Sequence, residues 1–509
     1  MDSVSFDNTK THHQAALVWA IVGISWGAIT YSYAGSIIGT TLGQPSFIMY
    51  MGLATNKHAE SLIGTMTGLF YAGGVFGCLL NAWMADRFGR KITVCTGAVI
   101  NIISTACLAG SVNIGMFIAF RFFCGVGSYM LYLSVPLWVI ELCPPKGRSI
   151  LGGIVGLFGV IGYILAAYVG IGFFYYKTTT SSQWRAPLAI GCFPAIVLLC
   201  WMPFLPESPR WLLAVDRNDE AWQIVKKLHT TKDDPDHEFA TAEFYQMKSQ
   251  HDLDRGLDGS WIEMFRRPSY RRRALLAFFL PVIMYTTGNL VITTYAASIF
   301  ASIGYGPGDS LQLLAGIYLA AIAGNLISLT YVDRVPRNVM LCTGVIVVTC
   351  ILSIETALVA KFLGTGNKAG LSAAAAFLFL FLAAFNMFLE GISWYYPAEI
   401  FPTHLRAKGM TLAVIGFCMV DILWLELAPT AIADIGWKYY LVFICLSVFG
   451  AATVFFLYPD TLGKPLEEVA KMFGDDDLVA IYQQDIHIDH AKHEVIEKNG
   501  TTFKEEAEA

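Results

Sequence analysis

The sequence carries little charge for its length. Only 14% of its 509 residues are charged, whereas 55% are hydrophobic and 14% are aromatic. Soluble domains carry about 25% charged residues, so a soluble globule of this composition would have too few charges for its surface. The formal net charge of -5 also provides no basic footprint for nucleic acid. These shortages argue against a soluble enzyme and against a nucleic-acid partner.

Patterns that carry catalytic or metal chemistry are also missing. No pair among the eleven cysteines has the spacing of zinc ligands or of a thiol redox site. The sequence has no phosphate-binding glycine-rich loop after a strand, no nucleophile elbow and no set of metal ligands. We therefore expect no enzyme activity, no metal and no cofactor, and no pumping driven by ATP.

Apolar runs fill most of the chain instead. About a dozen of them are roughly 20 residues long, which is the length that spans a bilayer. The sequence predicts an all-α polytopic membrane protein whose twelve transmembrane helices cover 15–39, 61–85, 93–112, 115–138, 152–175, 186–205, 274–300, 310–332, 339–361, 371–397, 408–431 and 438–458.

Basic residues in the connectors favour one orientation in the membrane. They gather on one side of the predicted spans, and the positive-inside rule makes that side cytoplasmic. Both chain ends then face the cytoplasm. The expected parts are a cytoplasmic N-terminal tail (1–14), a six-helix half (15–205), a cytoplasmic central loop with short amphipathic helices (206–273), a second six-helix half (274–458) and a cytoplasmic tail (459–509).

Three features of the first half recur in the second half in the same order. The repeated segments are 86–90 and 333–337, 141–148 and 399–406, and 206–207 and 459–460. Such repetition predicts two parallel six-helix repeats related by an axis along the membrane normal. In that arrangement, alternating access occurs when one half rocks against the other.

An ordered set of motifs resembles one known family. The motifs are Asp86 to Lys91, Pro136 with Glu141, Pro206 to Leu212, Trp394 with Pro397 to Pro402, and Pro459 to Glu468. Together they resemble the sugar porter family of the major facilitator superfamily over about residues 20–475. The first two spans, with Gly288 and Asn289, resemble its fungal disaccharide/hexose-permease-like branch. The resemblance implies a transporter of a sugar or a similar small molecule, acting as a monomer in the bilayer of the plasma membrane.

Charged residues at the cytoplasmic helix ends are candidates for a gate. Partly buried ion pairs have a large desolvation cost and a large mutual attraction, which leaves two states close in energy. We expect such charges to pair across the cytoplasmic mouth. The alternative is that they only anchor the helices and set the topology. The candidates are Asp86, Arg90, Glu141, Arg148, Glu207, Arg210, Asp333, Arg337, Glu399 and Arg406.

The expected substrate site departs from the family pattern. Met284 and Tyr285 stand where a glutamine pair is common, Gly156 replaces a further glutamine, and Phe417 and Cys418 replace an asparagine and a tryptophan. Losing amides weakens the case for an ordinary hexose. The remaining candidates suit a sugar, a polyol or a more apolar metabolite, or they serve only as packing between helices. They are Tyr33, Tyr285, Thr287, Asn289, Tyr295, Glu390 and Trp394.

Acidic residues inside the predicted spans are candidates for proton coupling. Glu390, Asp421 and Glu426 lie in the tenth and eleventh spans, where an unpaired acid is costly. Glu390 lies one helical turn before Trp394, so the two share a face. Ala34 replaces the first-span aspartate of many proton-coupled relatives.

Two mechanisms and two further functions therefore stay open. Glu390 or Asp421 carries a proton with the substrate, or the protein is a facilitator in which Glu390 binds hydroxyls or a cationic group. An efflux carrier for a non-sugar secondary metabolite would also keep this fold while losing the amides. A nutrient sensor that does not transport is the remaining alternative.

Overall fold

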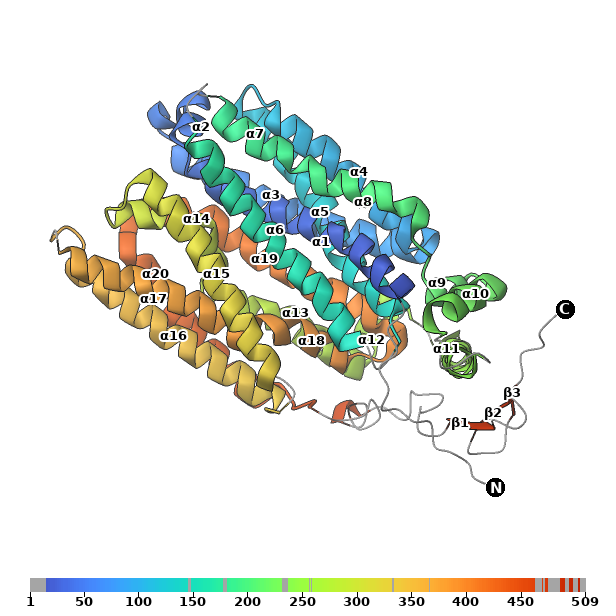
Figure 1. Ribbon diagram of the computed structural model, residues 1–509. Helices are drawn as coiled ribbons and strands as arrows, with labels where there is room; N and C mark the ends of the chain where they lie inside the picture. Colours follow the sequence, from blue (N-terminus) through green and yellow to red (C-terminus); the bar gives the residue numbers. More distant parts are fainter. Residues whose placement is uncertain are drawn as a thin grey trace.

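Long α-helices make up most of the structure (Figure 1). The computed structural model describes residues 15–144, 148–176, 181–230, 237–255, 257, 259–331, 334–365, 367–462, 469, 472–474, 486–489, 494–497 and 502–503. The blue-to-green helices of the first half and the yellow-to-red helices of the second half form two groups that lie side by side.

Six membrane-length segments come from the first half. They are α1 (Ala15–Leu42), α3 (Ala59–Phe88), α4 (Arg90–Ala109), α5 (Ile114–Leu142), α6 (Arg148–Phe174), and α7 (Ser182–Ile190) followed by α8 (Cys192–Trp201). Short elements flank them: α2 (Pro45–Tyr50), η1 (Leu53–Thr55) and η2 (Met202–Phe204).

The second half repeats this plan with two interrupted helices. Its segments are α13 (Pro268–Tyr285) with α14 (Asn289–Ser302), α15 (Pro307–Tyr331), α16 (Arg337–Phe362), α17 (Lys368–Phe385) with η3 (Asn386–Glu390) and α18 (Gly391–Ile400), α19 (Thr403–Ile435), and, after η4 (Gly436–Lys438), α20 (Tyr439–Leu457).

These helices supply the twelve predicted membrane crossings. Eleven stretches of the described residues are long and apolar enough to span a membrane, and the last, His404–Leu457, contains both α19 and α20. Large apolar side chains point outward, as Phe456 (79% exposed) and Phe449 (72% exposed) do. So much exposed apolar surface suits lipid rather than water.

Two predicted spans are not continuous α-helices. The seventh breaks at Gly288, whose φ of 89° is left-handed and is readily adopted only by glycine. A side chain there would also collide with the ring of Phe443, 2.8 Å from the Cβ position. The tenth contains the π-helical η3, which ends at Glu390. Such π segments are frequent at functional sites.

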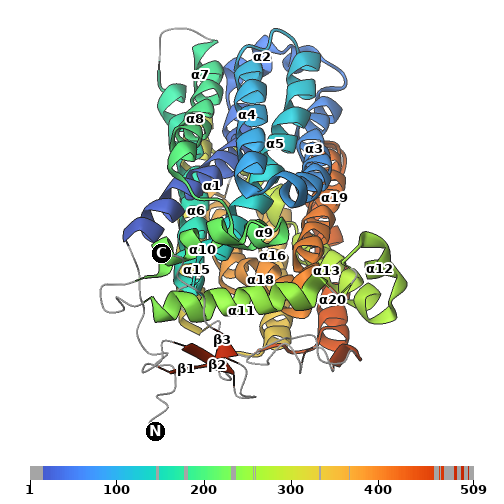
Figure 2. The same cartoon turned by 90° about the vertical axis from the view of Figure 1, so that its right-hand side faces the viewer.

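Short helices gather at one end of the bundle, which we call the loop end. They are α9 (Pro209–Ala214), α10 (Asn218–His229), α11 (Glu238–Arg255) and α12 (Trp261–Arg266), and α11 runs across the direction of the long helices (Figure 2). His229 attaches them to α5, because its Nε2 lies 2.9 Å from the Leu142 carbonyl oxygen and its Nδ1 lies 2.6 Å from Glu243 Oε2. The opposite end, with α2, is called the far end.

The C-terminal tail adds a small sheet to the expected all-α fold. Strands β1 (Ile486–Asp489), β2 (Glu494–Glu497) and β3 (Thr502–Phe503) pair antiparallel in the order β1-β2-β3.

Glycines allow α3 and α5 to approach closely. A Cβ at Gly125 of α5 would lie 1.8 Å from the Phe70 carbonyl oxygen of α3, and one at Gly73 of α3 would lie 2.0 Å from the Phe122 carbonyl oxygen. Close backbone approach at small residues is a common means of helix packing in membranes.

Replacing Gly125 with alanine should therefore force α3 and α5 apart. We expect Gly125→Ala to destabilise the fold by about 1–3 kcal/mol, the usual cost of overpacking. Gly153→Ala in α6 is the matched control, because a Cβ there meets nothing within 4 Å. The measurement is the apparent melting temperature of each purified variant in detergent. Equal melting temperatures for the two variants would contradict this account of the packing.

Candidate functional site

Aromatic rings from both halves meet at the middle of the bundle, around Phe417 of α19. Rings of the first half are contributed by α3 and α5, and rings of the second half by α13 and α18. Measured from the Phe417 centroid, they are Tyr285 at 4.5 Å, Trp394 at 5.6 Å, Tyr71 at 6.0 Å, Tyr129 at 6.1 Å and Tyr132 at 6.5 Å.

Glu390 lies beside this cluster and receives hydrogen bonds from two of its members. The Tyr285 hydroxyl donates to Oε2 at 2.9 Å, and Trp394 Nε1 donates to Oε1 at 3.4 Å. The Trp394 ring also lies 5.4 Å from the ring of Tyr132, on the opposite half. The structure therefore brings together three of the predicted site residues, Tyr285, Glu390 and Trp394.

Asp421 is a second acid near the cluster. Its side chain is completely buried, and neither carboxyl oxygen has a hydrogen-bond partner among the described residues. It lies one helical turn after Phe417. Glu426 is exposed and lies on a different face of α19 from Asp421, because residues five positions apart lie about 140° apart around a helix.

Three other predicted site residues do not join Glu390. The Tyr33 hydroxyl donates to the Pro187 carbonyl at 2.6 Å within the first half. Thr287 Oγ1 donates to the Met284 carbonyl at 2.7 Å. Asn289 begins α14 and is buried, and its Oδ1 has no hydrogen-bond partner in the described part of the chain. The contacts of Tyr33 and Thr287 are those of packing.

Tyr295 joins the two halves nearer the far end. Its hydroxyl donates to the Leu425 carbonyl at 2.9 Å and lies 2.7 Å from Thr67 Oγ1 of the first half. Further hydrogen bonds link the halves there, between Ser36 and Tyr318 at 3.2 Å and between Gln312 and Tyr175 at 3.2 Å.

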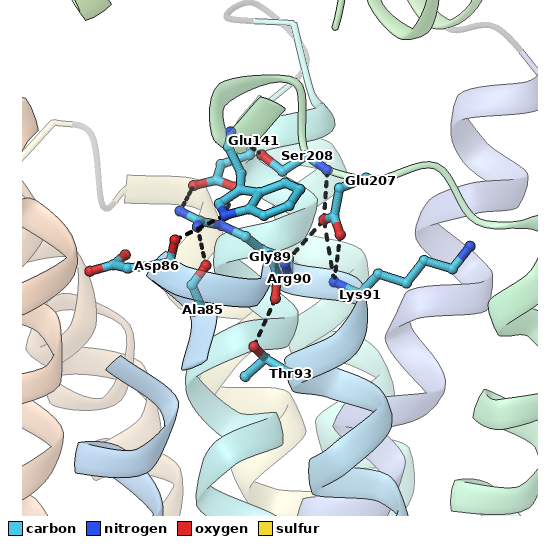
Figure 3. A network of polar contacts seen from close by, with 10 residues as sticks. Ala85, Asp86, Gly89, Arg90, Lys91, Thr93, Glu141, Glu207 and Ser208 are labelled. Atoms are coloured by element: carbon cyan, nitrogen blue, oxygen red, sulfur yellow. Dashed lines mark hydrogen bonds and ion pairs between the residues drawn. The ribbon is translucent and has the colours of Figure 1, made fainter. Parts of the chain in front are cut away.

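Arg90 and Glu141 form a buried ion pair at the loop end (Figure 3). Arg90 Nε donates to Glu141 Oε2 at 2.8 Å and Nη2 donates to Oε1 at 2.7 Å, while Nη1 donates to the Ala85 carbonyl at 2.8 Å. Two parallel bonds of this kind are among the stronger polar contacts in proteins. They tie the start of α4 to the end of α5.

Glu207 caps the start of α4 from the following connector. Its carboxylate accepts backbone N–H bonds from Arg90 at 3.0 Å, Lys91 at 3.3 Å and Ser208 at 2.9 Å. Burial raises the pKa of Glu207, and these bonds to the charged form oppose that shift. A Cβ at Gly89, where φ is 88°, would lie 2.6 Å from Glu207 Oε2, so the cap requires glycine there.

The second half repeats this arrangement. Arg337 Nη2 donates to Glu399 Oε1 at 3.0 Å, and Asp460 Oδ1 accepts the backbone N–H of Arg337 at 2.8 Å. Thr461 Oγ1 donates to Glu399 Oε2 at 2.5 Å. The repeated motifs thus form the same pairs at equivalent places.

These ion pairs differ from the expected pairing across the mouth. Each one joins two helices of the same half. The physical reason is local, because the arginine begins one helix beside the end of the helix that carries the glutamate. Of the other gate candidates, Asp333 lies outside the described residues and only the backbone of Arg148, at the start of α6, is described. The Asp86 carbonyl accepts Trp211 Nε1 at 3.0 Å, and Arg210 and Arg406 are half-buried.

Two charged residues buried inside spans are absent from the predicted site. Arg121 of α5 is 1% exposed, donates to the carbonyls of Ala34 at 3.0 Å and Met66 at 3.3 Å, and lies over the Phe70 ring. Glu355 of α16 is also 1% exposed. Both residues are charges within an apolar run, which is the same signal that indicates Glu390.

Comparison with known proteins places the chain among transporters. The family model described as "Sugar (and other) transporter" matches residues 19–473. The MFS-type transporter criB of Aspergillus cristatus is 31% identical over 458 residues, which cover 89% of this chain and 92% of criB. The sugar transporter STL1 of Saccharomyces cerevisiae is 28% identical, with 82% of this chain and 74% of STL1 covered.

A solved structure shares the fold. It is the proton:xylose symporter XylE bound to 6-bromo-6-deoxy-D-glucose, which matches with a TM-score of 0.75 at 20% identity. The match covers 91% of this chain and all of that chain.

The two ion pairs should contribute unequally to stability. Glu141→Gln leaves the Arg90 guanidinium buried without a charged partner, and breaking such a pair costs about 3–5 kcal/mol. Glu399→Gln should cost less, because the side chain of Glu399 is 30% exposed whereas that of Glu141 is 8% exposed. Apparent melting temperatures in detergent test the order. A larger decrease in melting temperature for Glu399→Gln than for Glu141→Gln would show that burial does not determine how much each ion pair stabilises the fold.

Proposed function

We propose that this chain, which belongs to the sugar transporter family of the major facilitator superfamily, moves a sugar or a sugar-like small molecule by alternating access. The relative STL1 is a sugar transporter, and XylE is a proton:xylose symporter. In this proposal protons move with the substrate, carried by Glu390 or Asp421.

The observation that carries the proposal is the position of Glu390. This acid lies in the middle of the bundle and receives hydrogen bonds from Tyr285 and Trp394. The Trp394 ring in turn contacts Tyr132 on the other half. An acidic group inside a membrane segment and facing the junction of two halves suits a substrate or proton path.

The distribution of contacts supports a rocking motion. The Arg90–Glu141 and Arg337–Glu399 pairs at the loop end each stay within a half, so a rotation of one half against the other leaves them intact. The hydrogen bonds of Tyr295, Ser36 and Gln312 join the halves toward the far end. Opening the far end would break those neutral bonds. In this account the loop-end residues brace each half, and the gate lies between the braced halves.

Orientation and assembly complete the proposal. The loop end faces the cytoplasm, since the basic connectors lie there, and both chain ends lie on that side. The protein acts as a monomer in the bilayer of the plasma membrane, with the small-molecule substrate and protons as its partners.

Protonation of Glu390 changes what its neighbours meet. The ionised carboxylate accepts from Tyr285 and Trp394, two neutral donors that leave its charge unbalanced. Adding a proton removes that charge and turns one oxygen into a donor. Burying the neutral carboxyl group between the halves costs less free energy than burying the carboxylate. Proton binding therefore favours the movement of one half against the other.

A second candidate is an efflux carrier for a non-sugar metabolite. The ring cluster around Phe417 favours it, since rings supply apolar contact where a hexose requires hydrogen-bond partners. The two candidates share the fold, the braced halves and Glu390.

Replacing Glu390 with glutamine tests proton coupling. We expect Glu390→Gln to abolish uphill accumulation and to leave downhill exchange, because glutamine keeps hydrogen-bonding capacity but does not titrate. The assay is uptake of labelled glucose, xylose, galactose, lactose, cellobiose and a polyol in yeast lacking its own hexose carriers, with external pH recorded. Asp434→Asn, at an exposed position of α19, is the control.

Each outcome of this assay has a clear meaning. Alkalinisation that matches uptake of one compound supports symport, and unchanged accumulation in Glu390→Gln contradicts the role of Glu390. If protein shown to be at the cell surface takes up no compound of the panel, the efflux carrier is favoured.

A further inference from the structure

The groups that remain accessible at the junction of the halves are mostly aromatic. Tyr31 and Tyr132 of the first half are partly exposed although they lie mid-span, and so are Glu390 and Trp394 of the second half. Tyr31 and Tyr132 contact each other edge to face at 4.8 Å. A molecule that enters between the halves here meets these three aromatic side chains and one carboxyl group.

The side-chain amides of Asn386 and Asn325 near this junction are already used. Asn386, at the start of η3, donates to the Leu382 carbonyl at 2.9 Å, and its Oδ1 accepts from Asn325 at 3.2 Å. A free hexose carries hydroxyls around its whole ring, and each one that is buried without a partner lowers affinity. Glu390 can serve only part of such a set, because Tyr285 and Trp394 already donate to it.

Phe417 holds the accessible rings in place. It is 7% exposed, and its ring is nearly parallel to that of Tyr132, with an angle of 13°, and nearly perpendicular to that of Trp394, with an angle of 78°. It thus supports one ring from each half from behind. An aliphatic or polar side chain at 417 would leave Tyr132 and Trp394 without this support.

We propose that the site binds a molecule with a flat aromatic ring and a hydrogen-bond donor. The ring lies against Tyr132 and Trp394, the donor meets Glu390, and Phe417 is the positioning residue that sets the preference. This inference rests on the alternating-access transport proposed above, and at the same site it favours the second candidate, a carrier for a non-sugar metabolite. A phenolic or alcoholic hydroxyl and an ammonium group both supply the donor.

Equilibrium binding to the purified full-length chain tests the preference. The probes are labelled tyrosol, labelled tyramine and labelled D-xylose. Tyrosol and tyramine have the same phenol ring and carbon chain, but tyrosol ends in an alcohol and tyramine in an ammonium group. We expect at least one aromatic probe to bind about tenfold more tightly than xylose, as ring contacts of this kind permit. Binding of tyramine alone, lost in Glu390→Gln, identifies an ammonium donor, and binding of tyrosol identifies a hydroxyl.

Variants at Phe417 separate positioning from folding. Phe417→Asn should abolish the preference for the aromatic probe over xylose, and Phe417→Tyr, which keeps a ring, should retain it. The melting temperature of each ligand-free variant reports on folding. If Phe417→Asn does not fold, Phe417→Leu replaces it, and this variant too should lose the preference.

Two results would overturn the inference. One is tighter binding of xylose than of both aromatic probes by the unmodified chain. The other is an unchanged preference in a folded Phe417→Asn or Phe417→Leu variant. Uptake of a sugar in the yeast assay together with either result would reject the aromatic substrate and keep the transport function. Absence of transport in cells and in vesicles would reject the function itself.

Discussion

The cost of removing a charge from water governs this structure, and the chain meets that cost in two ways. At the loop end, Arg90 and Arg337 are buried with carboxylates that satisfy them directly, so their attraction offsets much of the desolvation. In the middle of the bundle, Glu390 is held by neutral donors, and Asp421 has no hydrogen-bond partner in the described residues. The first solution fixes geometry, whereas the second leaves acids whose charge a proton or a ligand can balance.

The positions of the ion pairs and of the unpaired acids determine how the two halves can move. Arg90 links α4 to α5, and Glu207 adds the connector that follows the sixth membrane segment, so one end of the first half is firmly braced. Between the halves, aromatic rings and neutral hydrogen bonds are among the contacts of the described residues. Such contacts break without exposing an unpaired charge. Two braced units separated by a ring-lined junction can therefore exchange between states of similar energy.

Much of this was predictable from the sequence, because span length and motif repetition depend on local composition. The twelve crossings and Glu390 followed from the rule that lipid disfavours charge. Pairing was harder to predict, since the partner of Arg90 depends on how α4 and α5 pack. The rings around Phe417 come from four separate helices, and no spacing in the sequence reveals that they meet. The break at Gly288 and the π segment before Gly391 are local backbone choices that apolar periodicity does not report.

Distances between spin labels test the central claim that two braced halves move as units. In a chain whose eleven cysteines are replaced, labels at Ser61 of α3 and Asp434 of α19 report across the far end, and labels at Ser61 and Val112 report within the first half; all three positions are exposed. We predict two populations of distances across the halves, and the ratio of these populations changes with pH. In Glu390→Gln the ratio no longer depends on pH. Within the half we predict a single distance. A single unchanging distance across the halves, or equal broadening within the half, would contradict the account.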